Sequence, residues 1–214
     1  MNDLRDRRSE EKERRRNEIV QAADDLAREK GWDDVTVEGV AKRARLSRAL
    51  VYLYFKDKGE LHAAIWERAC DALYEYFLQA VQAQPDAHQK LMVLGNAYVS
   101  FAREMPHYFE AVSRFEAKTT SEDTVQGEAR AIARQQRVHQ LIVDTIDLAK
   151  REGALREDVG DSNLIAVSLW AFTHGIIQIV ATKGPQLDQE GIAVPALISH
   201  AFGMLEYALK KPSH

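Results

Sequence analysis

A serine and the three residues that follow it could bind the edges of DNA bases if they begin a helix. Ser47 is a residue type that caps helix N-termini. Arg48 could donate two hydrogen bonds to a guanine, whereas Ala49 and Leu50 could contact only a thymine methyl group. A solvent-exposed arginine without a DNA partner is the alternative interpretation of Arg48, and the surrounding residues favour the DNA contact.

Tyr52, Tyr54 and Lys58 could bind phosphates beside these base contacts. Lys58 follows Asp57, a good N-cap, and so falls in the first turn of the next predicted helix. A positive charge there opposes the helix dipole and gives no local stability. A phosphate held by Lys58 and by the N–H groups of the same helix start explains the lysine better.

Two short helices joined by a tight turn would position these side chains. The first begins at Thr36, and the second runs from Ser47 to about Phe55, after the three-residue break 44–46. This arrangement is typical of a helix-turn-helix, whose second helix enters the major groove of DNA. Thr36 and Arg45 complete the predicted set of DNA contacts.

The charge of the 214 residues is unevenly distributed. The whole chain carries a net charge of -4, but residues 36–58 hold six basic and two acidic side chains, a local charge of +4. This is a modest electrostatic footprint of the kind that phosphate binding needs. Residues 5–16 form a run of both basic and acidic side chains. This run is predicted to be a solvated helix start rather than a nucleic-acid arm.

The apolar spacing is helical along the whole chain, which predicts an all-α fold. One helix of about residues 10–30 precedes the helix-turn-helix. The others are predicted at about 58–83, 88–105, 107–118, 127–152, 161–182 and 195–210.

Residues 162–182 are uncharged, and their length is close to that of a membrane span. Polar residues such as Asn163, Thr173 and Gln178 are costly in lipid, so a buried core or a subunit interface is the preferred interpretation and no membrane partner is expected. The charged first residues predict no signal peptide, which makes the cytoplasm the expected location.

Residues 16–66 contain a series of short motifs in a specific order. They are Ile19-Val20-Gln21-Ala22-Ala23, Gly31-Trp32, Thr36-Val37, Val40-Ala41, Tyr52-Leu53-Tyr54-Phe55 and Lys58-Gly59-Glu60-Leu61. In this order they resemble the DNA-binding domain of the TetR family of bacterial transcriptional regulators. The resemblance implies a homodimer with an N-terminal three-helix helix-turn-helix domain and a C-terminal helical domain for ligand binding and dimerisation. The domains are predicted at residues 10–58 and 59–214.

Two positions depart from the family pattern. Arg45 stands in the turn where the family usually has glycine. A left-handed backbone at Arg45 would cost about 1–2 kcal/mol, whereas an unstrained turn would leave the arginine to contact phosphate, and both alternatives stay open here. Ala49 and Leu50 stand where glycine and threonine are frequent, so the operator cannot be inherited by analogy.

The resemblance also implies a pocket for a small-molecule effector, although most aromatic residues of such a domain belong to the core. Apolar and aromatic walls with few charges predict an apolar or aromatic effector. The predicted pocket residues are Tyr98, Phe101, Phe109, Phe115, Trp170 and His174.

No catalytic residues, no metal site and no cofactor are predicted. Glu104 and His107 have the spacing of one half of a di-iron site, but Pro106 interrupts the pair and no second pair exists in the sequence. The predicted function is that of a regulator, most simply a repressor released from a palindromic DNA operator by its effector. An all-α enzyme or metal carrier and a helical scaffold without specific DNA binding are the alternatives.

Apolar residues occupy more than one face of the predicted helices 161–182 and 195–210. One chain could not cover all of these faces, so a symmetric four-helix interface between two chains is expected. A two-fold protein predicts an operator with half-sites about 10 base pairs apart, or a multiple of that distance. The helix at 58–83 starts at a predicted phosphate contact and is the expected lever between effector and DNA.

Overall fold

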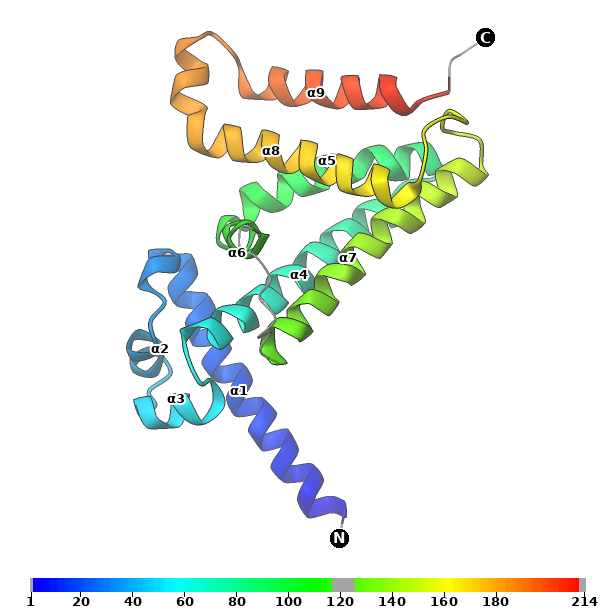
Figure 1. Cartoon of the computed structure of the whole chain (residues 1–214). Helices are drawn as coiled ribbons and strands as arrows, with labels where there is room; N and C mark the ends of the chain where they lie inside the picture. Colours follow the sequence, from blue (N-terminus) through cyan, green and yellow to red (C-terminus); the bar gives the residue numbers. More distant parts are fainter. Residues whose placement is uncertain (1, 117–125, 212–214) are drawn as a thin grey trace. The chain divides into compact units, whose positions relative to one another are not determined.

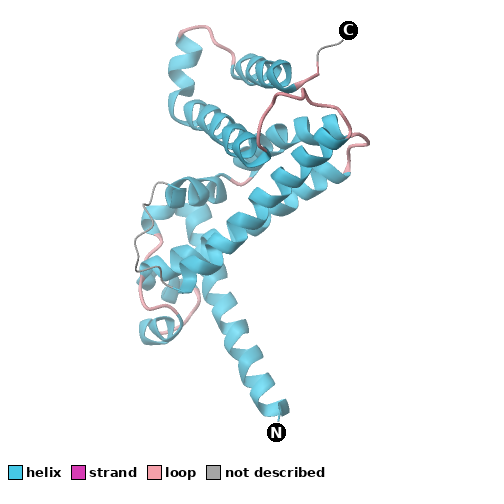
Figure 2. Cartoon of the chain, turned by 45° about the vertical axis from the view of Figure 1, so that its right-hand side comes forward, coloured by secondary structure: helices cyan, strands magenta, loops and turns pink. Residues whose placement is uncertain are grey.

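The computed structural model describes residues 2–116 and 126–211, with side chains for residues 7–114 and 129–211. These residues form α-helices and one 3₁₀ turn, η1 (Trp32–Asp34), with no strand among them (Figures 1 and 2). The prediction of an all-α fold is therefore confirmed. The helices are α1 (Asn2–Lys30), α2 (Val37–Arg43), α3 (Arg48–Tyr54), α4 (Lys58–Gln82), α5 (Ala87–Glu104), α6 (Pro106–Glu116), α7 (Gln126–Arg151), α8 (Ser162–Gln189) and α9 (Val194–Leu209).

The chain divides into two compact units. Unit 1 contains residues 1–71 and 105–135, and unit 2 contains residues 72–104 and 136–214. The helices α4 and α7 therefore each contribute residues to both units. The domain boundary expected at residues 58 and 59 falls at the first residue of α4 and stays a prediction.

The core of unit 1 is built on the apolar stripe of α1. Ile19 and Ala23 on this stripe are completely buried, as are Val40 of α2 and Val51 of α3. The helix α6 also belongs to this unit, where Tyr108 donates a hydrogen bond of 2.8 Å from its hydroxyl to Oδ2 of Asp24 in α1. The three helices of the predicted helix-turn-helix are therefore held by one continuous core.

The core of unit 2 is rich in aromatic side chains. Phe77, Tyr98 and Phe101 are buried, and the ring of Tyr98 lies near those of Phe77 and Phe101. A Cβ added at Gly95 of α5 would lie only 3.0 Å from the ring of Phe202 in α9. The absence of a side chain at Gly95 therefore allows this ring to pack directly on the backbone of α5.

The helix α8 is longer than the predicted segment 161–182. It continues to Gln189 although Pro185 lies inside it, and it bends in its last turns (Figure 1). A proline has no N–H to donate to the carbonyl one turn earlier, which is a common cause of such bends. By length and mean hydropathy α8 could cross a membrane, and only 22% of its most apolar window is buried within one chain.

The helix α1 also extends beyond its predicted start near residue 10 and begins at Asn2. Ion pairs one turn apart lie further along the exposed part of α1: Arg14 pairs with Glu18 at 3.0 Å, and Arg16 pairs with Glu13 at 3.9 Å. Such pairs stabilise an exposed helix by a few tenths of a kcal/mol each, about 0.2–0.5.

Candidate nucleic-acid interface and effector pocket

Two hydroxyl side chains begin the helices of the helix-turn-helix as the sequence predicts. Oγ1 of Thr36 accepts a hydrogen bond of 3.0 Å from the backbone N–H of Gly39, and α2 starts at the next residue. Oγ of Ser47 accepts one of 3.2 Å from the N–H of Leu50 at the start of α3. Both predicted N-caps are confirmed.

The turn between α2 and α3 contains a left-handed arginine. Arg45 has a φ of 57°, and it is the one residue other than glycine with a positive φ among those described. The N–H of Leu46 donates to the carbonyl of Ala41 at 2.8 Å, and the N–H of Arg45 donates to that of Lys42 at 3.2 Å. These two bonds define a Schellman motif, a helix ending that favours glycine at this position.

Two other helix ends in the chain show the same motif with glycine. Gly153 after α7 and Gly191 after α8 have φ values of 67° and 73° and occupy the position that Arg45 has after α2. The left-handed alternative for Arg45 is thus the one that the structure adopts. The backbone of the helix-turn-helix stores strain of about 1–2 kcal/mol at this residue.

Four of the nine residues predicted to contact DNA lie together on unit 1, where Thr36, Arg48, Tyr52 and Lys58 line one surface concavity. Arg48, Ala49, Tyr52 and Lys58 are exposed. Leu50 and Tyr54 are half-buried, and Arg45 is exposed at the turn. The whole concavity is lined by Thr36, Val37, Glu38, Arg48, Tyr52, Lys56, Asp57 and Lys58.

Two charged residues of this concavity were not singled out from the sequence. Glu38 lies in the first turn of α2, and its Oε2 is 3.7 Å from Nη1 of Arg48. Lys56 precedes α4 and is strongly exposed. The local excess of basic residues could have pointed to Lys56, but only the fold brings Glu38 next to Arg48.

The start of α4 is capped by two carboxylates. Oδ1 of Asp57 accepts a hydrogen bond of 2.9 Å from the N–H of Glu60, and Oε2 of Glu60 accepts one of 2.8 Å from the N–H of Lys56. Asp57 and Glu60 form a capping box in part, because Glu60 reaches one residue further back than the N-cap. Lys58 is left exposed in the first turn.

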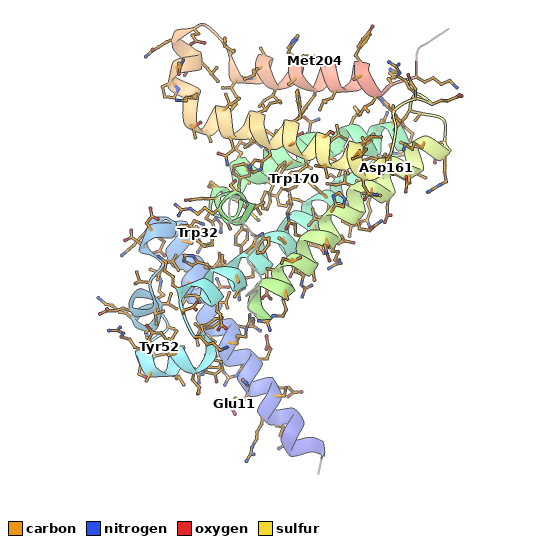
Figure 3. The ribbon with its side chains drawn as sticks, in the orientation of Figure 1. Glu11, Trp32, Tyr52, Asp161, Trp170 and Met204 are labelled. Atoms are coloured by element: carbon orange, nitrogen blue, oxygen red, sulfur yellow. The ribbon has the colours of Figure 1, made fainter. Side chains whose placement is uncertain are left out.

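Unit 2 contains a small cavity with mostly apolar walls, of about 50 Å³. Tyr98 of α5 and Trp170 of α8 stack against each other beside it, with ring centroids 4.6 Å apart (the position of Trp170 is labelled in Figure 3). Thr173 supplies a hydroxyl. The walls are formed by Phe77, Leu91, Met92, Leu94, Gly95, Tyr98, Ile142, Leu169, Trp170, Thr173, Phe202 and Leu205.

A polar chain begins at Tyr98. Its hydroxyl lies 2.7 Å from Nδ1 of His174, and Nε2 of His174 lies 3.4 Å from Nε2 of Gln178. Burial lowers the pKa of His174 below its ordinary value of 6.5, so the imidazole is neutral at neutral pH. In a neutral imidazole one ring nitrogen carries the proton and the other accepts, so His174 joins the Tyr98 hydroxyl and the Gln178 amide in one of two tautomers.

The predicted pocket residues do not all meet at this cavity. Tyr98 and Trp170 line it. His174 is not part of the wall, but its Nδ1 lies 2.7 Å from the hydroxyl of Tyr98. Phe101 is fully buried in the core of unit 2, and Phe109 is buried in unit 1 on α6. The side chain of Phe115 lies outside the described residues. Sequence spacing missed Phe77 and Phe202, which come from helices far away in the chain.

Among the described residues, no three His, Cys, Asp or Glu side chains are grouped as metal ligands. The helix-turn-helix with its exposed basic face, on an all-α chain with a second helical unit, defines a DNA-binding regulator. Residues 19–65 match the family described as bacterial regulatory proteins, tetR family, and residues 91–200 match the family described as tetracyclin repressor-like, C-terminal domain. The chain belongs to the TetR family of transcriptional regulators.

Several known proteins are similar to this chain over most of its length. The HTH-type transcriptional activator FasR of Mycolicibacterium smegmatis is 23% identical over 197 residues, which cover 92% of this chain and 85% of FasR. A protein of unknown function from Rhodococcus sp. RHA1 has a TM-score of 0.75 at 23% identity and covers 92% of this chain and 95% of its own. A putative transcriptional regulator from Saccharomonospora viridis, solved in complex with choline, has a TM-score of 0.69 at 18% identity, covering 94% and 100%.

Proposed function

We propose that this regulator is a homodimeric repressor that leaves a palindromic operator when a small apolar or aromatic molecule enters the cavity of unit 2. The observation that carries the proposal is the stacked pair Tyr98 and Trp170 beside an apolar cavity, in a chain with an exposed helix-turn-helix. A regulator needs both a DNA-binding face and a site whose occupancy can alter that face.

The DNA contacts of the proposal divide by chemistry. Arg48 donates to a guanine in the major groove, while Ala49 and Leu50 make apolar contacts with thymine methyl groups. The remaining residues hold the phosphate backbone and fix the orientation of α3. They are Thr36, Arg45, Tyr52, Tyr54 and Lys58, whereas Ser47 stays with the residues at the base edges.

The cavity must widen when the effector binds. Its volume of about 50 Å³ is well below the roughly 300–1,000 Å³ of pockets that hold small organic ligands. Phe202 and Leu205 of α9 form part of its wall and are the side chains that would move. An effector with flat apolar faces fits the aromatic walls, and one hydroxyl or carbonyl group would find a partner in Thr173 or Tyr98.

Choline is a second candidate effector, because the relative from Saccharomonospora viridis was solved with it. A quaternary ammonium group binds to the faces of aromatic rings by cation–π attraction. Tyr98 and Trp170 offer such faces, and Phe77 and Phe202 stand around the same cavity. Among the residues that the structure describes, no carboxylate lines this cavity, which favours the uncharged effector over choline.

The dimer would be formed by the exposed apolar faces of α8 and α9. Leu164 and Val167 on α8, and Met204 and Tyr207 on α9, are large apolar side chains that are more than half exposed in one chain. A second copy of the chain related by a two-fold axis would cover them. Two helix-turn-helix units then meet two half-sites of a palindrome.

The switch would act through α4, which contributes residues to both units. In one arrangement of the dimer, the distance between the two α3 helices does not match the distance between the half-sites of the operator. A ligand that prefers this arrangement reduces the population that can bind the operator. The shift cannot exceed the difference in its affinity for the two arrangements.

The experiment starts with selection of duplexes from a random library by the full-length protein. The recovered operator is then titrated with the protein, first alone and then with a panel of apolar aromatic compounds and with choline. Release of the operator by an aromatic compound, abolished in Trp170→Ala, is the expected result. Failure to select any duplex, or operator affinity unchanged by every compound that binds, would contradict the proposal. A reporter gene behind the operator distinguishes repression from activation.

A further inference from the structure

The first turns of α1 form an exposed helical arm. In unit 1 the N-terminal half of α1 projects beyond α2 and α3 (Figures 1 and 2). Residues 7–14 are exposed along this arm, and residues 7–16 include no apolar side chain. A helix that extends past the core without an apolar stripe contributes little to folding.

Winding into a helix sorts the charges of this segment. Arg8, Lys12 and Arg15 have the spacing i, i+4 and i+7, so they form one basic stripe along α1. Ile19 continues the same stripe into the buried core. Glu10 and Glu13 lie on other faces. The run that is mixed in sign along the sequence is therefore segregated in space.

The acidic residues beside the stripe form ion pairs with Arg14 and Arg15. Glu11 pairs with Arg14 at 3.7 Å, and Arg14 also pairs with Glu18. Arg15 is itself paired with Glu18 at 2.7 Å. Arg8 and Lys12 are exposed, and they are the residues of the stripe with most freedom to meet an outside anion.

The inner end of the arm lies near the end of α3. The guanidinium of Arg16 lies 5.4 Å from the ring centroid of Phe55, the residue that ends α3. Phe55 immediately precedes Lys56 and is three residues before Lys58. Arg8 is eight residues further out on α1, about 12 Å along the helix axis. In Figure 3 Glu11 on the arm and Tyr52 on α3 lie towards the same end of unit 1.

We propose that Arg8 and Lys12 form a second DNA-binding element, which holds phosphates beyond those reached by the helix-turn-helix; the proposal rests on the proposed function. Arg8 and Lys12 lie about 6 Å apart along the helix axis, a length over which duplex DNA carries several charges, one per roughly 1.7 Å of its axis. A membrane surface is a poorer partner, because an interfacial helix needs an apolar face. Two positive charges that contact only phosphates increase DNA affinity without adding base specificity.

The test compares the double variant Arg8→Gln/Lys12→Gln with the parent on the selected operator and on a random duplex of equal length. Glutamine is a good helix former, so the arm keeps its helix, which circular dichroism verifies. Four charges are lost per dimer, so the slope of log affinity against log salt should become shallower by up to about 3.6. At 0.1 M salt we expect at least about tenfold weaker binding to both duplexes.

Arg14→Gln is the control, because Arg14 lies two residues beyond Lys12 on the same arm but on another face of α1. It should bind both duplexes within about twofold of the parent. The exchange Arg8→Lys/Lys12→Arg keeps both positive charges and should keep the salt slope of the parent, since phosphate contacts require charge rather than shape. If the double variant has the same DNA affinity and salt slope as the parent, Arg8 and Lys12 do not bind DNA and the proposal is wrong. Absence of DNA binding by the parent would instead overturn the proposed function.

Discussion

Arg48 and Glu38 face each other across the helix-turn-helix, with Nη1 of the arginine 3.7 Å from Oε2 of the glutamate. Both side chains are largely exposed, so their pairing contributes little to stability. The glutamate nevertheless places a negative charge on the surface that must approach DNA phosphates. Arg48 also has to leave Glu38 before its guanidinium can bind a guanine.

Glu38→Gln should therefore strengthen DNA binding. Removing the charge reduces repulsion by phosphates and frees Arg48 from its partner, and we expect a gain of about 0.2–1 kcal/mol per protomer, the scale of an exposed ion pair. Titration of operator and random duplex at low and high salt measures it. Gln21→Glu serves as a comparison, because it adds a negative charge on α1, outside the concavity that Glu38 lines. Weaker binding by Glu38→Gln would indicate that the carboxylate itself contacts a base.

Arg48→Ala and Lys58→Ala should weaken DNA binding in different ways. Loss of one base contact should cost Arg48→Ala about 1–3 kcal/mol on the operator and relax the preference at one position per half-site. Lys58→Ala should weaken all sequences alike and reduce the dependence on salt, because a phosphate carries no sequence information. Selection from a random library by each variant separates the two roles. An Arg48→Ala variant as selective as the parent would remove Arg48 from the base contacts.

Arg45→Gly should stabilise the folded chain. Relief of the left-handed strain is worth about 1–2 kcal/mol, and the greater freedom of glycine in the unfolded chain takes back about 0.4–1 kcal/mol. We expect a net gain of roughly 0.5–1 kcal/mol in the free energy of unfolding by urea. Arg45→Ala is the control, because it removes the same charge but keeps the strain. Equal stability of the two variants would contradict the strain.

The same two variants test the DNA role of Arg45. If its guanidinium binds a phosphate, both variants should lose operator affinity equally, whatever their stability. A loss in Arg45→Gly alone would mean that the rigid turn, and not the charge, positions α3.

The helix-turn-helix was predictable from the sequence because its signals are local. Thr36 and Ser47 are N-caps, and the hydrogen bonds they make join residues three apart. The cavity was predictable only in part. Tyr98 and Trp170 lie 72 positions apart in the chain, and no spacing rule could pair them with Phe202. The bend of α8 was hidden for another reason: Gly184 and Pro185 signal a helix end, yet the helix continues through them.

Stability should fall in mild acid because of His174. Its pKa is lowered by burial, so the folded chain stays unprotonated at His174 at pH values where the unfolded chain, with an ordinary value of 6.5, already binds a proton. The free energy of unfolding therefore decreases as the pH falls below about 6.5, by at most about 1.4 kcal/mol per pH unit from this residue. His174→Gln should flatten this slope in urea titrations between pH 7.5 and 5. His139→Gln, on a partly exposed histidine of α7, should keep it.

The apolar face of α8 and α9 should bind a second copy of the chain. Val167 is 56% exposed in one chain, and Leu164 on α8 and Met204 on α9 are exposed as well. Val167→Lys would place an unpaired charge from each protomer in a buried interface, at a cost of about 3 kcal/mol or more. Light scattering at micromolar concentration should then give the 24.2 kDa mass of one chain, whereas the parent gives twice that mass.

The same variant should also lose its operator, because a monomer meets one half-site and forfeits the second set of contacts. Gln136→Lys, an exposed substitution on α7, adds the same charge outside the apolar face and should remain dimeric and bind as the parent does. A parent protein that scatters as a single chain would rule out the dimer. A dimeric Val167→Lys would place the interface on a different surface. A monomeric Val167→Lys with full operator affinity would show instead that one helix-turn-helix is sufficient, and that the operator has no need to be a palindrome.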